Sequence, residues 1–408
     1  MIHVEEALAI LKRRLPHWGK GSASLSEVGA FATRESLLAD RDYPPFDRVM
    51  MDGIAVSFSA YREGQRSFRI VGVCAAGVPQ KELTDPSTCF EVMTGAPLPK
   101  FTDLVIPYEE VTLTNGVATI DPDADNDACS SLRTRMQFVH LKGSDAREGD
   151  VLLPAGASLN GPHWGIAASV GAGVLQVDRR PRINLISTGD ELVPVAQTPL
   201  DFQIRRSNVH ALKASLALHG HVDVELSHLS DDVQAIETHF EESKSRFDLL
   251  IYSGGVSKGK FDHLPSTWKS LGVTECFHGV TQRPGKPLWF GVDEKNQTAV
   301  LGLPGNPVSS LVSLHRYLLS PHEVHAQLAE EIVFRKDLTF FVPVKLEHTR
   351  SGMLRAHPLK MRNSGEFSAL AGSDGFLELP REGSIFRAGE AYRYHSWHPF
   401  GSPPGSSQ

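Results

Sequence analysis

Two adjacent carboxylates, Asp190 and Glu191, follow a short apolar run in the stretch LISTGDELVPV. The run has the composition of a buried strand, and ligands of α/β proteins bind just beyond the ends of such strands. Thr188 and Gly189 stand between the run and the acids, where a hydroxyl and a backbone N–H could contact a ligand. The alternative is that the two acids only begin a helix or a turn.

A glycine-rich loop follows a second apolar run, in DLLIYSGGVSKGKFD. Ser253, Gly254 and Gly255 end this predicted strand, and Ser257 and Asp262 come shortly after. Consecutive glycines let backbone N–H groups approach a phosphate closely, and hydroxyl groups add further donors. The alternative is a tight strand-to-helix turn that needs glycine only for its dihedral angles.

A third loop lies between a strand and a helix in VLGLPGNPVSS. Pro304 and Gly305 end the strand, Asn306 stands at the expected N-cap, and Pro307 takes the first helical position. The unpaired N–H groups and the positive end of the helix dipole would therefore face the end of the strand. Helix capping alone would also explain Asn306.

Two cations, Arg283 and Lys286, precede this loop in QRPGKPLWFG. Proline and glycine frame the turn that carries them, which favours a fixed position beside a phosphate or another oxyanion. An exposed turn would tolerate the same two cations without any ligand.

Carboxylates beside a phosphate site need a partner of opposite charge. Asp190, Glu191 and Asp262 would each repel a nearby phosphate by a few kcal/mol at an intermediate dielectric constant. Mg²⁺ typically binds one or two carboxylates together with substrate phosphate oxygens, and water completes its shell. We therefore expect a bound Mg²⁺ at these acids.

Two further aspartates lie outside the three loops. Asp52 stands in PPFDRVMMDGIAV and Asp145 in GSDAREGD, and either could belong to an ordinary Asx turn. The histidines lack a second ligand pair at zinc-site spacing. The chain also has no GxGxxG, no Walker P-loop and no G-x-S-x-G motif.

Composition limits the partners of this chain of 408 residues. A net charge of -7 argues against a general polyanion-binding surface, so we expect no nucleic-acid partner. The four cysteines are scattered and have no CxxC spacing, which is typical of reduced thiols. No apolar run reaches the roughly 18–20 residues of a membrane span, and the N-terminus does not read as a signal peptide. We expect a cytoplasmic protein with no membrane partner.

The pattern of apolar residues predicts several domains. A helix in the first 16 residues precedes a second one over 26–40, and a short helix near 162–171 has Pro162 in its first turn. Strands and helices alternate after Pro181, which predicts a parallel, doubly wound sheet. We expect the following division: a helical linker region, 1–45 and 140–177; an inserted β-domain, 46–139; an α/β domain, 178–324; a C-terminal β-domain, 325–400; and a disordered tail, 401–408.

Taken together, these motifs resemble the molybdopterin molybdenumtransferase family, which includes the bacterial MoeA proteins and the C-terminal E domain of gephyrin. The resemblance rests on motifs in the order that the family has them: PPFDRVMMDGIAV, VMTGAPLP, GDVLLPAG, RPRINLISTGDEL, IRRSN, SGGVSKGKFD, RPGKPLWFG and LPGNPVSSLVS. It covers about residues 4–395 and implies the same four-part architecture, with the α/β domain binding molybdopterin.

The resemblance also implies an activity and partners. A homodimer would take adenylylated molybdopterin and molybdate, insert molybdenum and release AMP in the presence of Mg²⁺. Protein partners would be the adenylyltransferase of the same pathway and apo-molybdoenzymes. In the family motifs the functional positions are occupied by Asp52, Asp145, Asp190, Glu191, Asp262 and Lys286, with weaker matches at Asp231 and Ser364. Asp190, Glu191, Asp231 and Asp262 are the expected metal ligands, and Arg283 and Ser257 the donors for molybdate.

The chain departs from the family pattern at several motif positions. Lys260 replaces a usual acid, Arg283 a common lysine, and Arg206 the acid of IRDSN, while DRVMMDGIAV replaces DNSAMDGYAV. These changes either retune the anion site or mark a non-catalytic molybdopterin carrier or scaffold. A third hypothesis is the related adenylyltransferase step, which the additional domains disfavour.

Overall fold

The computed structural model describes residues 1–27, 31–122, 133–257, 262–319, 323–361 and 363–399. Lys260 and the tail predicted over 401–408 lie outside these residues. Contacts divide the chain into two units, one of residues 22–177 and one of residues 1–21 with 178–408. None of the described helices is long and apolar enough to cross a membrane.

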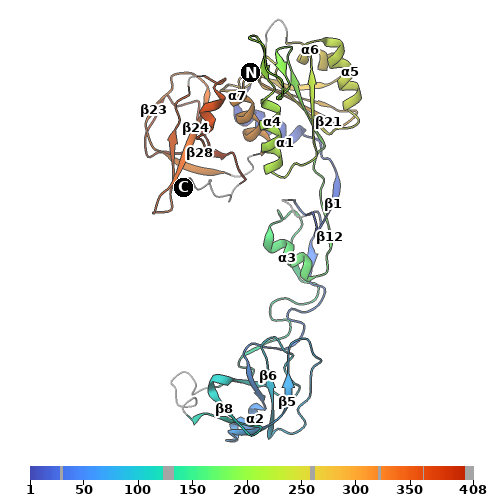
Figure 1. The fold of residues 1–408 in the computed structure, drawn as a ribbon, viewed down its shortest axis with the longest axis vertical. Coiled ribbons are helices and arrows are strands. Elements are labelled where there is room, and N and C mark those ends of the chain that lie inside the picture. Colours follow the sequence, from blue (N-terminus) through green and yellow to red (C-terminus); the bar gives the residue numbers. More distant parts are fainter. Residues whose placement is uncertain (28–30, 123–132, 258–261, 320–322, 362, 400–408) are drawn as a thin grey trace. The chain divides into compact units, whose positions relative to one another are not determined.

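The unit of residues 22–177 contains a six-stranded sheet with the order β7-β4-β6-β5-β9-β8 (Figure 1). Side chains alternate along β4, so that Ile54 packs into one apolar cluster and Ala55 into another on the opposite face. The strands are β4 (Gly53–Val56), β5 (Ser67–Cys74), β6 (Thr88–Val92), β7 (Leu104–Pro107), β8 (Val111–Thr114) and β9 (Val117–Ile120), and the short helix α2 (Phe58–Arg62) follows β4.

Short paired strands make up the rest of this unit. The pairs are β1 (Lys20–Ser24) with β12 (Val174–Asp178), β2 (Leu37–Leu38) with β11 (Val151–Leu153), and β3 (Arg48–Val49) with β10 (Val139–His140). The predicted helix near 162–171 is confirmed as α3 (Gly161–Ser169). Asn160 caps it by accepting a hydrogen bond from the N–H of His163, and Pro162 lies in its first turn.

The helix predicted over residues 26–40 is wrong for its described residues: 26 and 27 lie in a turn and a bend, and 31–40 contain isolated bridges, bends and the short strand β2. Backbone N–H groups of this segment bond to distant segments, Thr33 to the carbonyl of Ala157 and Ala39 to that of Asp150. These long-range hydrogen bonds outweigh the weak local helix preference.

The other unit is built on a sheet with the order β16-β13-β17-β21-β20-β18. Its strands are β13 (Ile183–Thr188), β16 (Val224–Leu229), β17 (Leu249–Ser253), β18 (Thr274–His278), β20 (Trp289–Asp293) and β21 (Thr298–Leu303). Its helices are α1 (Val4–Arg14), α4 (Asn208–Leu218), α5 (Val233–Ser243), α6 (Leu264–Ser270) and α7 (Pro307–Leu314). Residues of α1, α4 and α7 share one apolar cluster, and those of α5 and α6 share another, so helices cover both faces as predicted (Figure 1).

The sheet is parallel only in part. The four strands β16, β13, β17 and β21 are parallel, but β20 is antiparallel to β21, and β18 is antiparallel to β20. Only a short turn joins β20 to β21, and a parallel connection would need a crossover of a dozen or more residues. The prediction of a wholly parallel sheet is therefore wrong at this edge.

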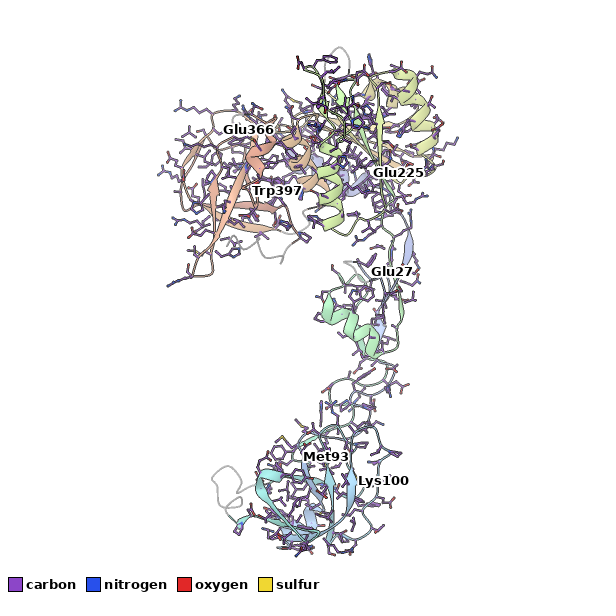
Figure 2. All side chains as sticks on the ribbon, viewed as in Figure 1. Glu27, Met93, Lys100, Glu225, Glu366 and Trp397 are labelled. Atoms are coloured by element: carbon purple, nitrogen blue, oxygen red, sulfur yellow. The ribbon has the colours of Figure 1, made fainter. Side chains whose placement is uncertain are left out.

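The C-terminal strands form a closed ring, because β24 pairs with both β25 and β26. The ring consists of β24 (Thr339–His348), β25 (Leu354–Pro358), β22 (Val324–Leu328), β28 (Ala391–Ser396) and β26 (Gly375–Leu379). β19 (Gln282–Arg283) pairs with β24 from outside the ring. The Trp397 ring (Figure 2) lies 4.9 Å from that of His315, in the π-helical turn after α7, and so joins this domain to the α/β domain.

Candidate active site

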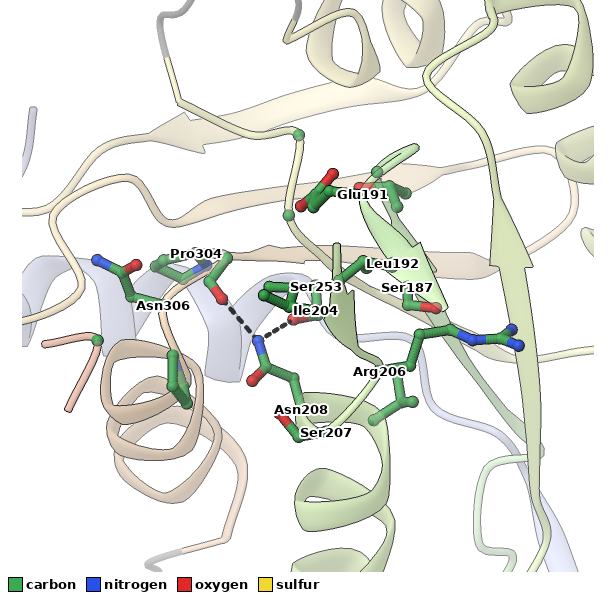
Figure 3. A pocket seen from close by; sticks show the side chains of 18 of the residues that line it. Ser187, Glu191, Leu192, Ile204, Arg206, Ser207, Asn208, Ser253, Pro304 and Asn306 are labelled. Atoms are coloured by element: carbon green, nitrogen blue, oxygen red, sulfur yellow. Dashed lines mark hydrogen bonds between the residues drawn. The ribbon is translucent and has the colours of Figure 1, made fainter. Parts of the chain in front are cut away.

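A cavity of about 830 Å³ lies at the carboxyl ends of β13, β17 and β21 (Figure 3). All three loops identified in the sequence contribute to its lining. The predicted site residues that line it are Thr188, Gly189, Glu191, Asp231, Ser253, Gly254, Gly255, Ser257, Asp262, Pro304, Gly305 and Asn306. Parallel strands bring these loops together, because their carboxyl ends meet at one edge of the sheet.

Four other predicted residues of the same unit do not line the cavity: Asp190, Arg283, Lys286 and Ser364. Asp190 lies close by, and its Oδ1 accepts a 3.4 Å hydrogen bond from the N–H of Asp231. Arg283 and Lys286 are exposed on the turn before Pro287, and Pro287 itself lines the cavity.

Buried Gln282 holds the turn that carries Arg283 and Lys286. Its Nε2 donates to the carbonyls of Pro284 and Gly285, and its Oε1 accepts a hydrogen bond from the hydroxyl of Tyr317. The buried Gln282 side chain thus holds the backbone of this turn through hydrogen bonds, and the exposed Arg283 and Lys286 side chains extend from that backbone.

The turn at Gly254 and Gly255 requires glycine. Both residues have positive φ, +109° and +67°, which side chains disfavour. A Cβ atom on Gly254 would also lie 2.9 Å from the hydroxyl of Thr188, and one on Gly255 would lie 2.8 Å from Leu264. The turn therefore brings bare backbone close to the end of β13, as a phosphate-binding loop would.

Thr188 has a hydroxyl group that favours a ligand here. The residue is 5% exposed, and its Oγ1 has no hydrogen-bond partner within the described part of the chain. Buried polar groups are almost always paired, and an unpaired one costs about 1–3 kcal/mol. Because Thr188 lines the cavity, an oxygen of a bound anion could accept the hydrogen of this hydroxyl.

The acids near the cavity influence one another. Burial raises the pKa of Asp231, and the negative charges of Asp190, Glu191 and Asp262 raise it further. Within the described ranges, no three His, Cys, Asp or Glu side chains gather closely enough to hold a metal ion. Mg²⁺ needs only one or two carboxylates when phosphate oxygens complete its shell, so the acids fit a cation that arrives with an anionic substrate.

Asn306 is the N-cap residue of α7, and Pro307 follows it, as the sequence indicates. The side chain of Asn306 makes no capping hydrogen bond, however. Its Nδ2 donates to Ser364 Oγ at 2.9 Å, and the N–H of Val308 donates to the carbonyl of Ser364. The first turn of α7 is therefore held by a loop of the C-terminal domain.

Sequence reasoning missed several lining residues, including Gln203, Arg205, Asn208 and Phe367. Asn208 donates from Nδ2 to Ser253 Oγ at 3.0 Å and to the carbonyl of Gly305 at 2.7 Å (Figure 3). The sequence placed Asn208 at the start of a predicted helix near the strand ends, and that position could have identified it as a residue of the cavity. These two acceptors lie on different loops of the cavity.

Arg206, which was noted only as a departure from the family pattern, also lines the cavity. Burial lowers the pKa of His228 on β16, and the charge of Arg206 lowers it further. Arg206 therefore brings positive charge to the same edge of the sheet as the acids.

Asp52 and Asp145 lie in the unit of residues 22–177. Asp52 Oδ1 accepts hydrogen bonds from the N–H of Thr94 at 2.6 Å and from its hydroxyl at 2.8 Å, and both lower the pKa of Asp52. Asp145 Oδ1 lies 2.7 Å from His140 Nε2, and His140 Nδ1 lies 3.0 Å from an Arg48 nitrogen. An ordinary Asx turn would involve only residues next in sequence, whereas Asp52 bonds to Thr94 and Asp145 contacts His140.

Comparison with known proteins identifies relatives along the whole chain. Residues 2–171 match the MoeA N-terminal region (domain I and II), residues 184–322 a probable molybdopterin binding domain, and residues 325–397 the MoeA C-terminal region (domain IV). A protein of Synechocystis named molybdopterin molybdenumtransferase is 49% identical over 398 residues, covering 97% of this chain and all of the relative.

More distant relatives belong to the same family. A molybdopterin molybdenumtransferase of Bacillus subtilis is 30% identical and covers 85% of this chain and 82% of its own. The crystal structure of the molybdopterin biosynthesis MoeA protein from Pyrococcus horikosii superimposes with a TM-score of 0.79 at 25% identity, covering 98% of this chain and all of that one. The resemblance found in the motifs is thus confirmed, and the chain belongs to the molybdopterin molybdenumtransferase family.

Proposed function

We propose that this chain inserts molybdenum from molybdate into adenylylated molybdopterin and releases AMP, as part of molybdenum cofactor biosynthesis. Relatives with 49% and 30% identity are named as transferases, which favours a catalyst over a non-catalytic carrier. The observation that carries the proposal is the cavity, which is lined both by carboxylates and by glycine turns, together with a Thr188 hydroxyl that has no partner among the described residues.

In this proposal the glycine turn and the start of α7 bind the pyrophosphate of the substrate. Ser253, Gly254 and Gly255 offer a hydroxyl and backbone N–H groups, and the dipole of α7 favours negative charge near Asn306. Arg206 adds a cation to the cavity wall. Ser257 and Arg283 are proposed donors to molybdate, and Ser364 supports this region through Asn306.

Glu191 and Asp262 are the proposed holders of Mg²⁺, with Asp190 and Asp231 beside them. When bound, Mg²⁺ would neutralise charge on the pyrophosphate oxygens. The residues of the chain then orient the reacting phosphate. An oxygen of water or of molybdate forms a bond to the phosphorus of the pterin phosphate, the bond from that phosphorus to the bridging oxygen breaks, and AMP leaves with this oxygen and its electron pair. Where water attacks, its proton passes to solvent.

We further propose a cytoplasmic homodimer. The family motifs supply Asp52, Asp145 and Lys286 as additional catalytic residues. The hydrogen bonds from Thr94 keep Asp52 ionised, which suits a carboxylate that binds a cation or accepts a proton. The adenylyltransferase of the same pathway and apo-molybdoenzymes are the proposed protein partners.

The test is an assay with purified protein, adenylylated molybdopterin, Mg²⁺ and molybdate. We expect AMP release and a product that activates an apo-molybdoenzyme. Tight binding without AMP at saturating molybdate would instead indicate a carrier. Consumption of ATP with unmodified molybdopterin would indicate the adenylyltransferase step.

A further inference from the structure

Asn208 joins two loops of the cavity through a single nitrogen atom. Its Nδ2 donates to Ser253 Oγ at 3.0 Å and to the carbonyl oxygen of Gly305 at 2.7 Å (Figure 3). Ser253 ends β17, and Gly305 lies between β21 and α7. The residue itself is the first of α4 and is half-buried in the cavity wall.

These two bonds make the Ser253 hydroxyl an acceptor toward Asn208. A carbonyl oxygen only accepts, so the amide nitrogen of Asn208 must face Gly305, and both of its hydrogens are used. The Ser253 oxygen then acts as an acceptor toward Asn208, which leaves its own hydrogen for another partner. Ser253 is 4% exposed and lines the cavity, and no described residue accepts that hydrogen. The Ser253 hydroxyl can therefore donate this hydrogen to an anion bound in the cavity.

The second bond fixes the peptide between Gly305 and Asn306. The C=O and N–H of a trans peptide point in opposite directions, so a carbonyl held by Asn208 also fixes the N–H of Asn306. Within the described part of the chain, this N–H has no acceptor. It stands at the start of α7, where unpaired N–H groups and the helix dipole attract anions.

We propose that Asn208 is a positioning residue for the anion-binding part of the cavity. It leaves the Ser253 hydroxyl free to donate to a phosphate group in the cavity, and by holding the Gly305 carbonyl it fixes the direction of the Asn306 N–H. The anion-binding role follows from the geometry, while the identity of that phosphate as the pyrophosphate of the pterin nucleotide rests on the proposed function.

The first experiment measures the affinity of the full-length protein for inorganic pyrophosphate with Mg²⁺ by calorimetry. We expect Asn208→Ala to weaken binding about 10-fold, the loss typical of a hydrogen bond to a charged group. Asn208→Asp should weaken it more, because a carboxylate would accept the Ser253 hydrogen and repel the Gly305 carbonyl. The control is His210→Ala, an exposed position two residues along α4, which should bind as the wild type does.

A purely structural role for Asn208 makes a different prediction. If the residue only attached α4 to the sheet, both substitutions would lower the melting temperature and leave pyrophosphate affinity in the folded protein unchanged. That result would overturn the proposal. Equal affinity losses in Asn208→Ala and His210→Ala would overturn it as well.

A double-mutant cycle tests whether Asn208 acts through Ser253. We expect Ser253→Ala to lose affinity, and the double variant to lose less than the two single losses combined, because the Ser253 component is already absent. Fully additive losses would contradict action through Ser253.

Kinetics separate this inference from the proposed function. If the wild type releases AMP, Asn208→Ala should raise KM for adenylylated molybdopterin about 10-fold with kcat within about 2-fold, because the lost contact serves bound substrate and transition state equally. A wild type that binds pyrophosphate but releases no AMP would refute the proposed function, and the affinity measurements would still decide the role of Asn208.

Discussion

The carboxylate of Asp248 accepts two hydrogen bonds from the guanidinium of Arg179, at 2.8 and 2.9 Å. Arg182 bonds to the same carboxylate through its backbone N–H and its side chain. Arg179 also donates to the carbonyl of Trp18, so a single buried acid fixes the two chain segments that run into the α/β domain.

This arrangement predicts how the stability of the protein depends on pH. Burial alone would raise the pKa of Asp248, but the hydrogen bonds from Arg179 and Arg182 outweigh burial and lower it. Because the folded-state pKa is lowered, the stabilisation is complete above the ordinary value near 4 and is lost as the pH falls through the folded-state value.

Asp248→Asn should therefore reduce the free energy of unfolding at pH 7 by about 1–3 kcal/mol, because the carboxylate is buried but its two guanidinium partners are partly exposed. The difference from the wild type should shrink below pH 4. Urea unfolding at pH 7 and pH 3 measures both values, with Asp201→Asn, an exposed acid, as the control. A constant difference between the two pH values would show that Asp248 carries no shifted pKa.

Gly254→Ala should abolish anion binding. The substitution places a Cβ 2.9 Å from the Thr188 hydroxyl at a φ of +109°, so the turn must move. Gly272→Ala is a matched control, since Gly272 has φ +88° but open space around it. Both variants should lose about 1–3 kcal/mol of stability from backbone strain, and only Gly254→Ala should lose pyrophosphate affinity in calorimetry.

Glu191→Gln should lower kcat for AMP release more than it lowers substrate affinity, because the carboxylate is proposed to act on charge that develops in the transition state. It should also raise the Mg²⁺ concentration needed for half-maximal rate. The neighbouring Asp190→Asn should have a smaller effect on kcat, since Asp190 does not line the cavity. Equal losses of kcat and affinity in Glu191→Gln would restrict this carboxylate to binding.

Thr94→Val should raise the pKa of Asp52. The Thr94 N–H and hydroxyl lower this pKa, and valine removes the hydroxyl while it keeps the N–H. The carboxylate should then become protonated at a higher pH than in the wild type. Carbon-13 NMR of the Asp52 side chain measures this directly, and an unchanged titration curve would show that the hydroxyl has no effect.

The sequence predicted the cavity well because strand ends are encoded locally. Buried runs ending at Thr188, Ser253 and Leu303 are easy to recognise, and parallel pairing then brings their loops together. The side chains that connect the loops were not predictable in this way. Asn208 lies 45 residues before Ser253 and 97 before Gly305, and no local pattern indicates that pairing.

The sequence missed two features of the secondary structure for different reasons. Residues 31–40 have a helix-like pattern, but hydrogen bonds to residues 150, 157 and 176 keep them out of a helix, because contacts with distant segments outweigh the local signal. β20 was not predicted as a strand, although its residues are wholly buried and it pairs with β21 across a short turn.

In our proposal the loops after β13, β17 and β21 form one anion site for the pterin nucleotide. A crystal soaked with AMP, Mg²⁺ and molybdate would reveal where the phosphate binds. We predict that the AMP phosphate lies within hydrogen-bonding distance of Ser253 Oγ and the turn at Gly254 and Gly255. Ordered AMP elsewhere on the protein, with this cavity holding only water, would show that these loops are not the anion site.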